Sequence, residues 1–284
     1  DRHVLFPAVP RSMLPPPYCG GVRAASVFCQ VPMSAVDAVR WVLVALLLVV
    51  ASGYRPRLTG VLHAYIAFSF AATSPLLDGG DQVAAVLTLL LLPITLTDPR
   101  RWHWDPPPPG DRPYGGLLSF FASWLVRLQV AGIYLHAGVG KMAVDDWANG
   151  TALHYWLRHP IVGVAEPYAR WLLPLTSHGA PLALLTWGVI ALELLLGVAF
   201  LTSPRLQRVL LPLGLALHLA ILVLHGLVSF ALIMMAALLL YLRPLGAPLR
   251  WPLARSSGGR RQTEPARLPL DNAPGAGAEA LRHA

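Results

Sequence analysis

The sequence predicts an all-α protein, a polytopic helical membrane bundle with about seven spans. Hydrophobic residues make up 55% of the 284-residue chain and charged residues only 13%, against roughly 25% charged residues in soluble domains. Several runs are long enough to cross a bilayer, which takes roughly 20 mostly apolar residues in a helix. Arginines gather in every second loop between these runs. So little charge could not cover the surface of a soluble protein of this size.

Three predicted spans lie in the first third of the chain. Residues 36–53 (VDAVRWVLVALLLVVASG) are strongly apolar, and residues 58–77 contain no formally charged side chain. Residues 82–97 form a shorter run, which stops before the polar segment that begins at Asp98. Each run comes close to the roughly 17 to 25 residues that a spanning helix needs.

The fourth and fifth predicted spans each contain an ionisable side chain. Residues 115–140 are crossed by Arg127, and residues 180–202 are crossed by Glu193. A charge at bilayer depth costs roughly 2.5–3.5 kcal/mol on insertion scales, so such residues face other helices or a wet cavity and often mark a functional site. These two spans are therefore where we expect the polar contacts of the bundle.

The last apolar run must form two spans. Residues 209–242 carry no formal charge, and a single helix of that length would measure about 51 Å, far more than the roughly 30 Å of a bilayer core. We divide the region into spans at 206–223 and 227–242, with His225 and Gly226 at the turn.

The charges of the loops predict the orientation of the bundle. Cytoplasmic loops carry an excess of lysine and arginine, and basic residues follow the first, third, fifth and seventh spans. The loop 141–179 and the segment before the first span are then outside, and the protein is predicted to be multi-pass in a cell membrane. The basic side holds Arg55, Arg57, Arg100, Arg101, Arg112, Arg205, Arg208 and Arg243, and the other side holds Asp78, Asp81, Asp145 and Asp146.

The domain organisation follows from this orientation. Residues 1–35 are predicted to be an extracytoplasmic segment, residues 36–243 the transmembrane domain, and residues 244–284 a disordered cytoplasmic tail, rich in Arg, Pro and Gly.

Cys19 and Cys29 lie outside the membrane and could form a disulfide, although two free thiols are the alternative. The chain begins at Asp1 without a methionine, so we expect it to be N-terminally incomplete. We attribute the net charge of +8 to arginines on one side of the membrane, and we do not take it as a sign of nucleic-acid binding.

Lys141 is the strongest candidate for a catalytic residue. It is the only lysine among 22 basic residues, and it follows Arg127 and Tyr134 at intervals of seven, which places the three on nearly one helix face. Gly138 and Gly140 precede it and are expected to weaken the end of this helix at the outer membrane boundary. Two interpretations stay open: a partly desolvated amine that acts as a base, or an interfacial lysine whose ammonium group reaches water.

Glu193, His136 and Arg127 are the further candidates for catalytic roles. Glu193 has no charged neighbour in its own span, so it must pair across helices, with Arg127 as one candidate partner, be protonated, or line a wet cavity. His136 projects from the other side of the fourth span. With His63, His218 and His225 it could suggest a metal site, but no HExxH, CxxC or carboxylate cluster is present. Hydrogen-bonded histidines are therefore the preferred interpretation for most of them, and no metal is predicted.

Several segments resemble the sporulation-delaying protein B family. They are SGYRPRLTGVLH (52–63), LLDGGDQVAAVLTLLLLPITLTDPRRWHW (76–104), YLHAGVGKMAVDDWANGTALHYWL (134–157), HGLVSF (225–230) and LYLRP (240–244). That family is grouped with the horizontally transferred transmembrane (HTTM) domains, which are distantly similar to the vitamin K-dependent γ-carboxylase. The carboxylase segment with its catalytic lysine is similar to residues 133–150, and Lys141 falls on that lysine. Its histidine after the LLDGG-like segment has no counterpart at 82–86.

The composition indicates no particular function, whereas the family resemblance implies one. It implies a protein of the bacterial cytoplasmic membrane that is needed for maturing or producing a secreted peptide toxin, with the toxin precursor and a small partner protein from the same operon as partners. Lys141 would be the base if the protein is an enzyme, and the sequence does not indicate which cofactor, if any, it would use. The alternative is a non-catalytic binding, export or immunity module whose buried charges only hold helices together.

Overall fold

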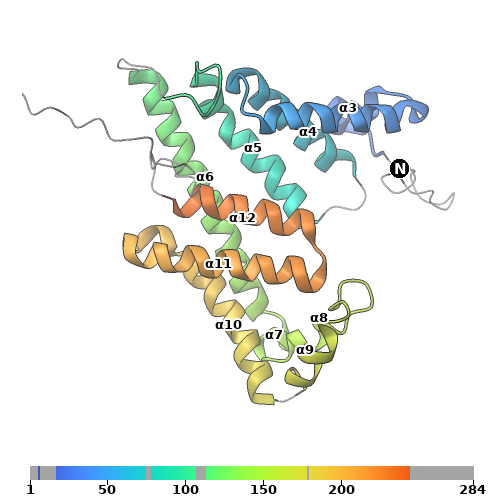
Figure 1. The fold of residues 1–284 in the computed structure, drawn as a ribbon, viewed down its shortest axis with the longest axis vertical. Helices are drawn as coiled ribbons and strands as arrows, with labels where there is room; N and C mark the ends of the chain where they lie inside the picture. Colours follow the sequence, from blue (N-terminus) through green and yellow to red (C-terminus); the bar gives the residue numbers. More distant parts are fainter. Residues whose placement is uncertain (1–5, 7–16, 75–77, 107–112, 178, 244–284) are drawn as a thin grey trace, which may run out of the picture. The chain divides into compact units, whose positions relative to one another are not determined.

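The computed structural model describes residue 6 and residues 17–74, 78–106, 113–177 and 179–243, which are helical with no strand among them (Figure 1). The prediction of an all-α helical bundle is confirmed. The contacts of the chain divide it after residue 244, and everything below belongs to the first part. The predicted disordered tail, 244–284, lies outside the described residues.

The segment before the first span is attached to the bundle by hydrogen bonds. It contains the short helix α2 (Val27–Gln30), and a disulfide joins Cys19 to Cys29. The hydroxyl of Ser26 caps α2 by accepting a hydrogen bond from the backbone of Phe28, and it donates one to the carbonyl of Ser69, at 3.1 Å. Because Ser26 is completely buried, this hydrogen bond holds the segment against the second predicted span.

The first three predicted spans form α3 (Val36–Ala51), α4 (Pro56–Thr73) and α5 (Gly79–Thr97). α5 begins three residues earlier than the apolar run suggests. A capping box explains this start, because Asp78 accepts from the backbone of Asp81 and the Asp81 side chain accepts from the backbone of Asp78.

The later spans form α6 (Pro113–Met142), α10 (Gly179–Gly197), α11 (Pro204–His225) and α12 (Val228–Leu242). The predicted turn at His225–Gly226 is confirmed, since Gly226 ends α11 with a φ of 68°, a conformation that glycine adopts without strain. Between α6 and α10 the chain forms three short helices, α7 (Asp145–Ala148), α8 (Ala152–Leu157) and α9 (Ala169–Leu175).

The number of spans is approximate. Five of the described helices are long and apolar enough to cross a membrane, with bounds of Met33–Ala51, Gly79–Thr97, Gly115–Met142, Gly179–Gly197 and Pro204–His225. α4 is less apolar than these five, and α12 has only 15 residues, or about 22 Å of helix. The helices nevertheless lie where all seven predicted spans were placed.

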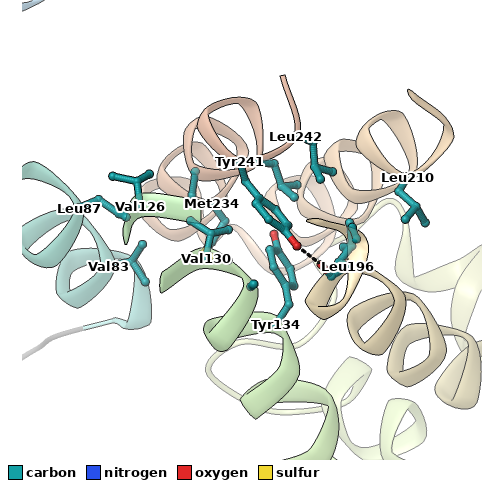
Figure 2. Close-up of a cluster of buried hydrophobic side chains, with 14 residues drawn as sticks. Val83, Leu87, Val126, Val130, Tyr134, Leu196, Leu210, Met234, Tyr241 and Leu242 are labelled. Atoms are coloured by element: carbon teal, nitrogen blue, oxygen red, sulfur yellow. Dashed lines mark hydrogen bonds between the residues drawn. The ribbon is translucent and has the colours of Figure 1, made fainter. Parts of the chain in front are cut away.

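The largest buried core among the described residues lies where α6 packs against α5, α10 and α12, and Leu210 of α11 belongs to the same cluster (Figure 2). Figure 2 shows Tyr134 of α6 and Tyr241 of α12 approaching each other in its centre. The Tyr241 hydroxyl donates to the carbonyl of Leu196 at 2.9 Å and accepts from the backbone N–H of Phe200 at 3.0 Å. The hydroxyl thereby supplies hydrogen bonds to backbone groups at the end of α10. Lipid chains could not supply them, because they have no hydrogen-bonding groups.

Single cysteines would test the predicted orientation. His103 lies in the loop after α5, which is predicted to be cytoplasmic, and Tyr155 lies in the loop predicted to be outside; both side chains are more than half exposed. We expect a membrane-impermeant maleimide to label Tyr155→Cys in intact cells and His103→Cys only after permeabilisation. The native cysteines are joined to each other and do not react. Labelling of position 103 in intact cells would contradict the orientation.

Candidate functional site

Three polar side chains of α6 form a row, and each contacts a different helix. Arg127, Tyr134 and Lys141 are spaced by seven residues, about 10.5 Å along the helix axis for each step. Lys141 contacts α10, Tyr134 contacts α11, and Arg127 contacts the end of α12. The predicted common face is confirmed, and it is the face that α6 turns toward the later helices.

The strongest of these contacts is an ion pair between Lys141 and Glu193. The ammonium nitrogen Nζ of Lys141 donates to both carboxylate oxygens of Glu193, each at 2.8 Å. The side chains are 23% and 11% exposed, so the pair is largely but not fully removed from solvent. Nζ also lies 5.2 Å from the centre of the Trp147 ring, a distance at which the ring attracts a cation. The amine is therefore held by one anion and one aromatic face.

Close packing of α6 on α10 brings this pair together. A Cβ atom on Gly197 would lie 2.9 Å from the backbone nitrogen of Leu135, and one on Gly138 would lie 2.8 Å from the side chain of Leu194. The helices approach this closely only because neither glycine has a side chain. The helix α6 continues through Gly138 and Gly140 and ends at Met142, one residue after Lys141. Gly138 is a packing residue.

A second polar contact lies two helical turns from the ion pair. The Tyr134 hydroxyl lies 2.6 Å from Nε2 of His218 on α11, and both residues are buried. The ring of Phe230 covers the imidazole at 5.6 Å between centroids. Nδ1 of His218 is buried without a hydrogen-bond partner among the described residues. The contact extends the polar row of α6 into the core.

Arg127 does not pair with Glu193, so that prediction is wrong. Its Nη2 donates to the backbone carbonyl of Arg243 at 2.7 Å, just beyond α12, and its guanidinium lies 5.7 Å from the ring of Trp124. The physical reason is distance along the helix. Arg127 is fourteen residues before Lys141, or about 21 Å, and Glu193 lies at the Lys141 end.

The structure does not bring His136 to the ion pair. Its side chain is exposed on α6, on the side away from the polar row. In the part of the chain that the structure describes, no group of three or more His, Cys, Asp or Glu residues could hold a metal ion. His136 therefore shares no site with Lys141 and Glu193.

The loop beside the ion pair is anchored by contacts that sequence reasoning missed. His225, at the end of α11, donates from Nδ1 to the carbonyl of Val162 at 2.6 Å, and Trp187 of α10 donates to the carbonyl of Ala148 at 3.1 Å. Arg158 joins α8 to α9 by donating to the carbonyl of Leu173 at 2.8 Å. The sequence of this loop could not reveal these contacts, because composition does not show which backbone carbonyl a side chain meets.

Fold and site together define a polytopic helical membrane protein in which one helix, α6, makes polar contacts with α10, α11 and the end of α12. The HTTM domain family matches residues 116–245, the stretch from α6 to the end of α12 that contains all three contacts.

Two proteins of Bacillus subtilis (strain 168) are similar over most of the chain. The uncharacterized protein YitO is 37% identical over 218 residues, 76% of this chain and 70% of YitO. Sporulation-delaying protein SdpB is 34% identical over 230 residues, 80% of this chain and 71% of SdpB. The chain belongs to the SdpB family of HTTM-domain proteins. No solved structure matches it.

Proposed function

We propose that this protein matures a secreted peptide toxin in the bacterial cytoplasmic membrane and that the Lys141–Glu193 pair carries the chemistry. The observation that supports the proposal is the pair itself, an amine held at 2.8 Å from both oxygens of a carboxylate at the end of the longest helix. SdpB is named for delaying sporulation, and the kinship favours a role in the same kind of system. The partners would be the toxin precursor and a small protein of the same operon.

The pair offers a path for a proton. Transfer of one proton from the Lys141 ammonium to the Glu193 carboxylate converts the ion pair into a neutral amine and a neutral acid. This exchange costs less in partly buried surroundings than in water, because neither neutral group needs the solvation that its charged form needs. The neutral amine could then remove a proton from a peptide substrate, and Glu193 would hold the first proton meanwhile.

The surroundings of the pair suit a peptide. Lys141 keeps part of its side chain exposed, and the neighbouring loop presents large apolar side chains to the surface, among them Tyr155, Trp156, Ile161 and Trp171. Asp145 and Asp146 are exposed in the same loop. Such a surface could bind an apolar peptide that carries a basic group. The peptide would approach from the side on which the Lys141 amine is partly exposed.

A non-catalytic module is the second candidate function, and the closed geometry of the pair favours it. Both Glu193 oxygens are already engaged by Lys141, which is also what a purely structural link between α6 and α10 requires. In that case the protein would bind, export or give immunity to the peptide without changing it covalently.

Mass spectrometry of the secreted peptide tests the proposal. Cells that produce the toxin precursor and the operon partner are compared with and without this protein. If the protein matures the toxin, the mature mass should disappear without it and only precursor or a differently processed form should remain. An unchanged mass with reduced secretion would instead favour export, and an unchanged mass and amount with self-killing would favour immunity.

A further inference from the structure

A pocket lined mainly by arginines lies between the start of α4 and the loop after α5, in a part of the sequence that precedes Lys141. It has a volume of about 390 Å³ and is lined by the start of α4 and the loop after α5. That volume falls within the roughly 300–1,000 Å³ of small-molecule sites. Its lining consists of Arg55, Arg57, Leu58, Pro99, Arg100 and Arg101, so four of the six residues are arginines.

Backbone contacts hold the two walls of the pocket together. The backbone N–H of Arg55 donates to the carbonyl of Arg101 at 2.7 Å, and that of His103 donates to the carbonyl of Gly53 at 2.8 Å. The rings of Tyr54 and Trp102 meet at 5.0 Å between centroids. The arginines are therefore fixed on a built scaffold rather than carried by independent loops.

Arg55 has an unusual backbone conformation at this position. Its φ is 42°, in the left-handed region that residues other than glycine rarely adopt. Conformations of this kind are strained, persist only where the surroundings impose them, and cluster at functional sites. Here the conformation sets Arg55 at the rim where Pro56 begins α4.

Among the described residues, Arg100 is the only one of the four arginines that pairs with a carboxylate. Arg100 donates from Nε to both oxygens of Asp98, at 2.8 and 3.0 Å. Burial opposes the ionisation of Asp98, but the hydrogen bonds and charge of Arg100 hold the pKa of that carboxyl below its usual range. In the described parts of the chain, no carboxylate pairs with Arg55, Arg57 or Arg101. Three arginines of the pocket lining thus have no carboxylate partner among the described residues.

We propose that this pocket binds a phosphate group, either that of an anionic lipid or that of a soluble phosphate compound. Arginine presents planar pairs of N–H donors that match phosphate oxygens, and it is the preferred side chain for this recognition. A loop arginine that only sets membrane orientation needs neither a cavity nor a constrained backbone. Leu58 adds an apolar edge to the pocket, with 63% of its surface exposed, which would suit the glycerol or acyl part of a lipid.

The full-length protein in detergent provides the test, with its thermal unfolding midpoint followed by the fluorescence of its nine tryptophans. The probes are phosphatidylglycerol, dioleoylglycerol (the same chains without phosphate) and inorganic pyrophosphate. A ligand that binds the folded state raises the midpoint, and we expect a rise of at least about 2 °C at saturation. The double variant Arg57→Gln/Arg101→Gln should lose this rise, whereas Arg205→Gln, an exposed arginine at the start of α11, should keep it.

Each outcome separates the sources or overturns the proposal. A rise with phosphatidylglycerol alone identifies a lipid headgroup, a rise with pyrophosphate alone identifies a soluble phosphate compound, and a rise with both identifies the phosphate group itself. Equal rises with dioleoylglycerol, a rise that survives in the double variant, or no rise with any probe would overturn it. If the double variant unfolds without ligand, Arg101→Gln alone serves in its place, and it should weaken pyrophosphate binding at least about tenfold.

Discussion

Lys141→Arg is expected to lower toxin maturation at least about a hundredfold per protein molecule while leaving the protein folded in the membrane. Removing a general base typically costs a factor of about 10²–10⁴. Arginine keeps the positive charge and can donate two hydrogen bonds to Glu193, as Lys141 does at 2.8 Å, but it does not lose its proton in proteins. The substitution therefore separates the link between α6 and α10 from the proton chemistry.

The measurement compares mature toxin, by mass spectrometry, with the amount of protein in the membrane. Arg205→Lys, a swap between the same two residue types at an exposed position, is the matched control and should retain full maturation. Full maturation by Lys141→Arg at normal abundance would end the catalytic interpretation. The pair would then be a structural link, and the non-catalytic module would be the better account of the protein.

Gly197→Ala is expected to destabilise the bundle by about 1–3 kcal/mol, the cost of forcing an extra group into a packed interface. The added Cβ would lie 2.9 Å from the nitrogen and 3.0 Å from the Cα atom of Leu135. Because backbone atoms of α6 cannot rotate away as a side chain can, the two helices must separate. Glu193 is one helical turn before Gly197 on α10, so the separation should also stretch its ion pair with Lys141.

Gly188→Ala is the matched control on the same helix. Nothing lies within 4 Å of a Cβ atom at Gly188, and alanine is a better helix former than glycine by about 1 kcal/mol. The thermal unfolding midpoint in detergent should therefore fall for Gly197→Ala and stay equal or rise for Gly188→Ala. Equal midpoints for the two variants would show that the close contact of α6 with α10 contributes nothing to stability.

Part of this site was already visible in the sequence. The intervals of seven placed Arg127, Tyr134 and Lys141 on one face, and the structure confirms that this face makes the polar contacts. The helical period alone sets which residues share a face. The helical period does not set which helix each residue meets. For this reason the sequence suggested Arg127 as a partner for Glu193, whereas the structure pairs Glu193 with Lys141.

The sequence by itself determined the all-α membrane fold, the places of the seven apolar segments, the turn at Gly226 and the kinship with the SdpB family. These depend on length, hydropathy and local backbone preference, which neighbouring residues decide among themselves. Only the tertiary structure decided that Lys141 pairs with Glu193, 52 residues away, and that four arginines from two separate segments surround one pocket. Such contacts depend on how closely helices approach, and at Gly197 that distance is set by the absence of a single side chain.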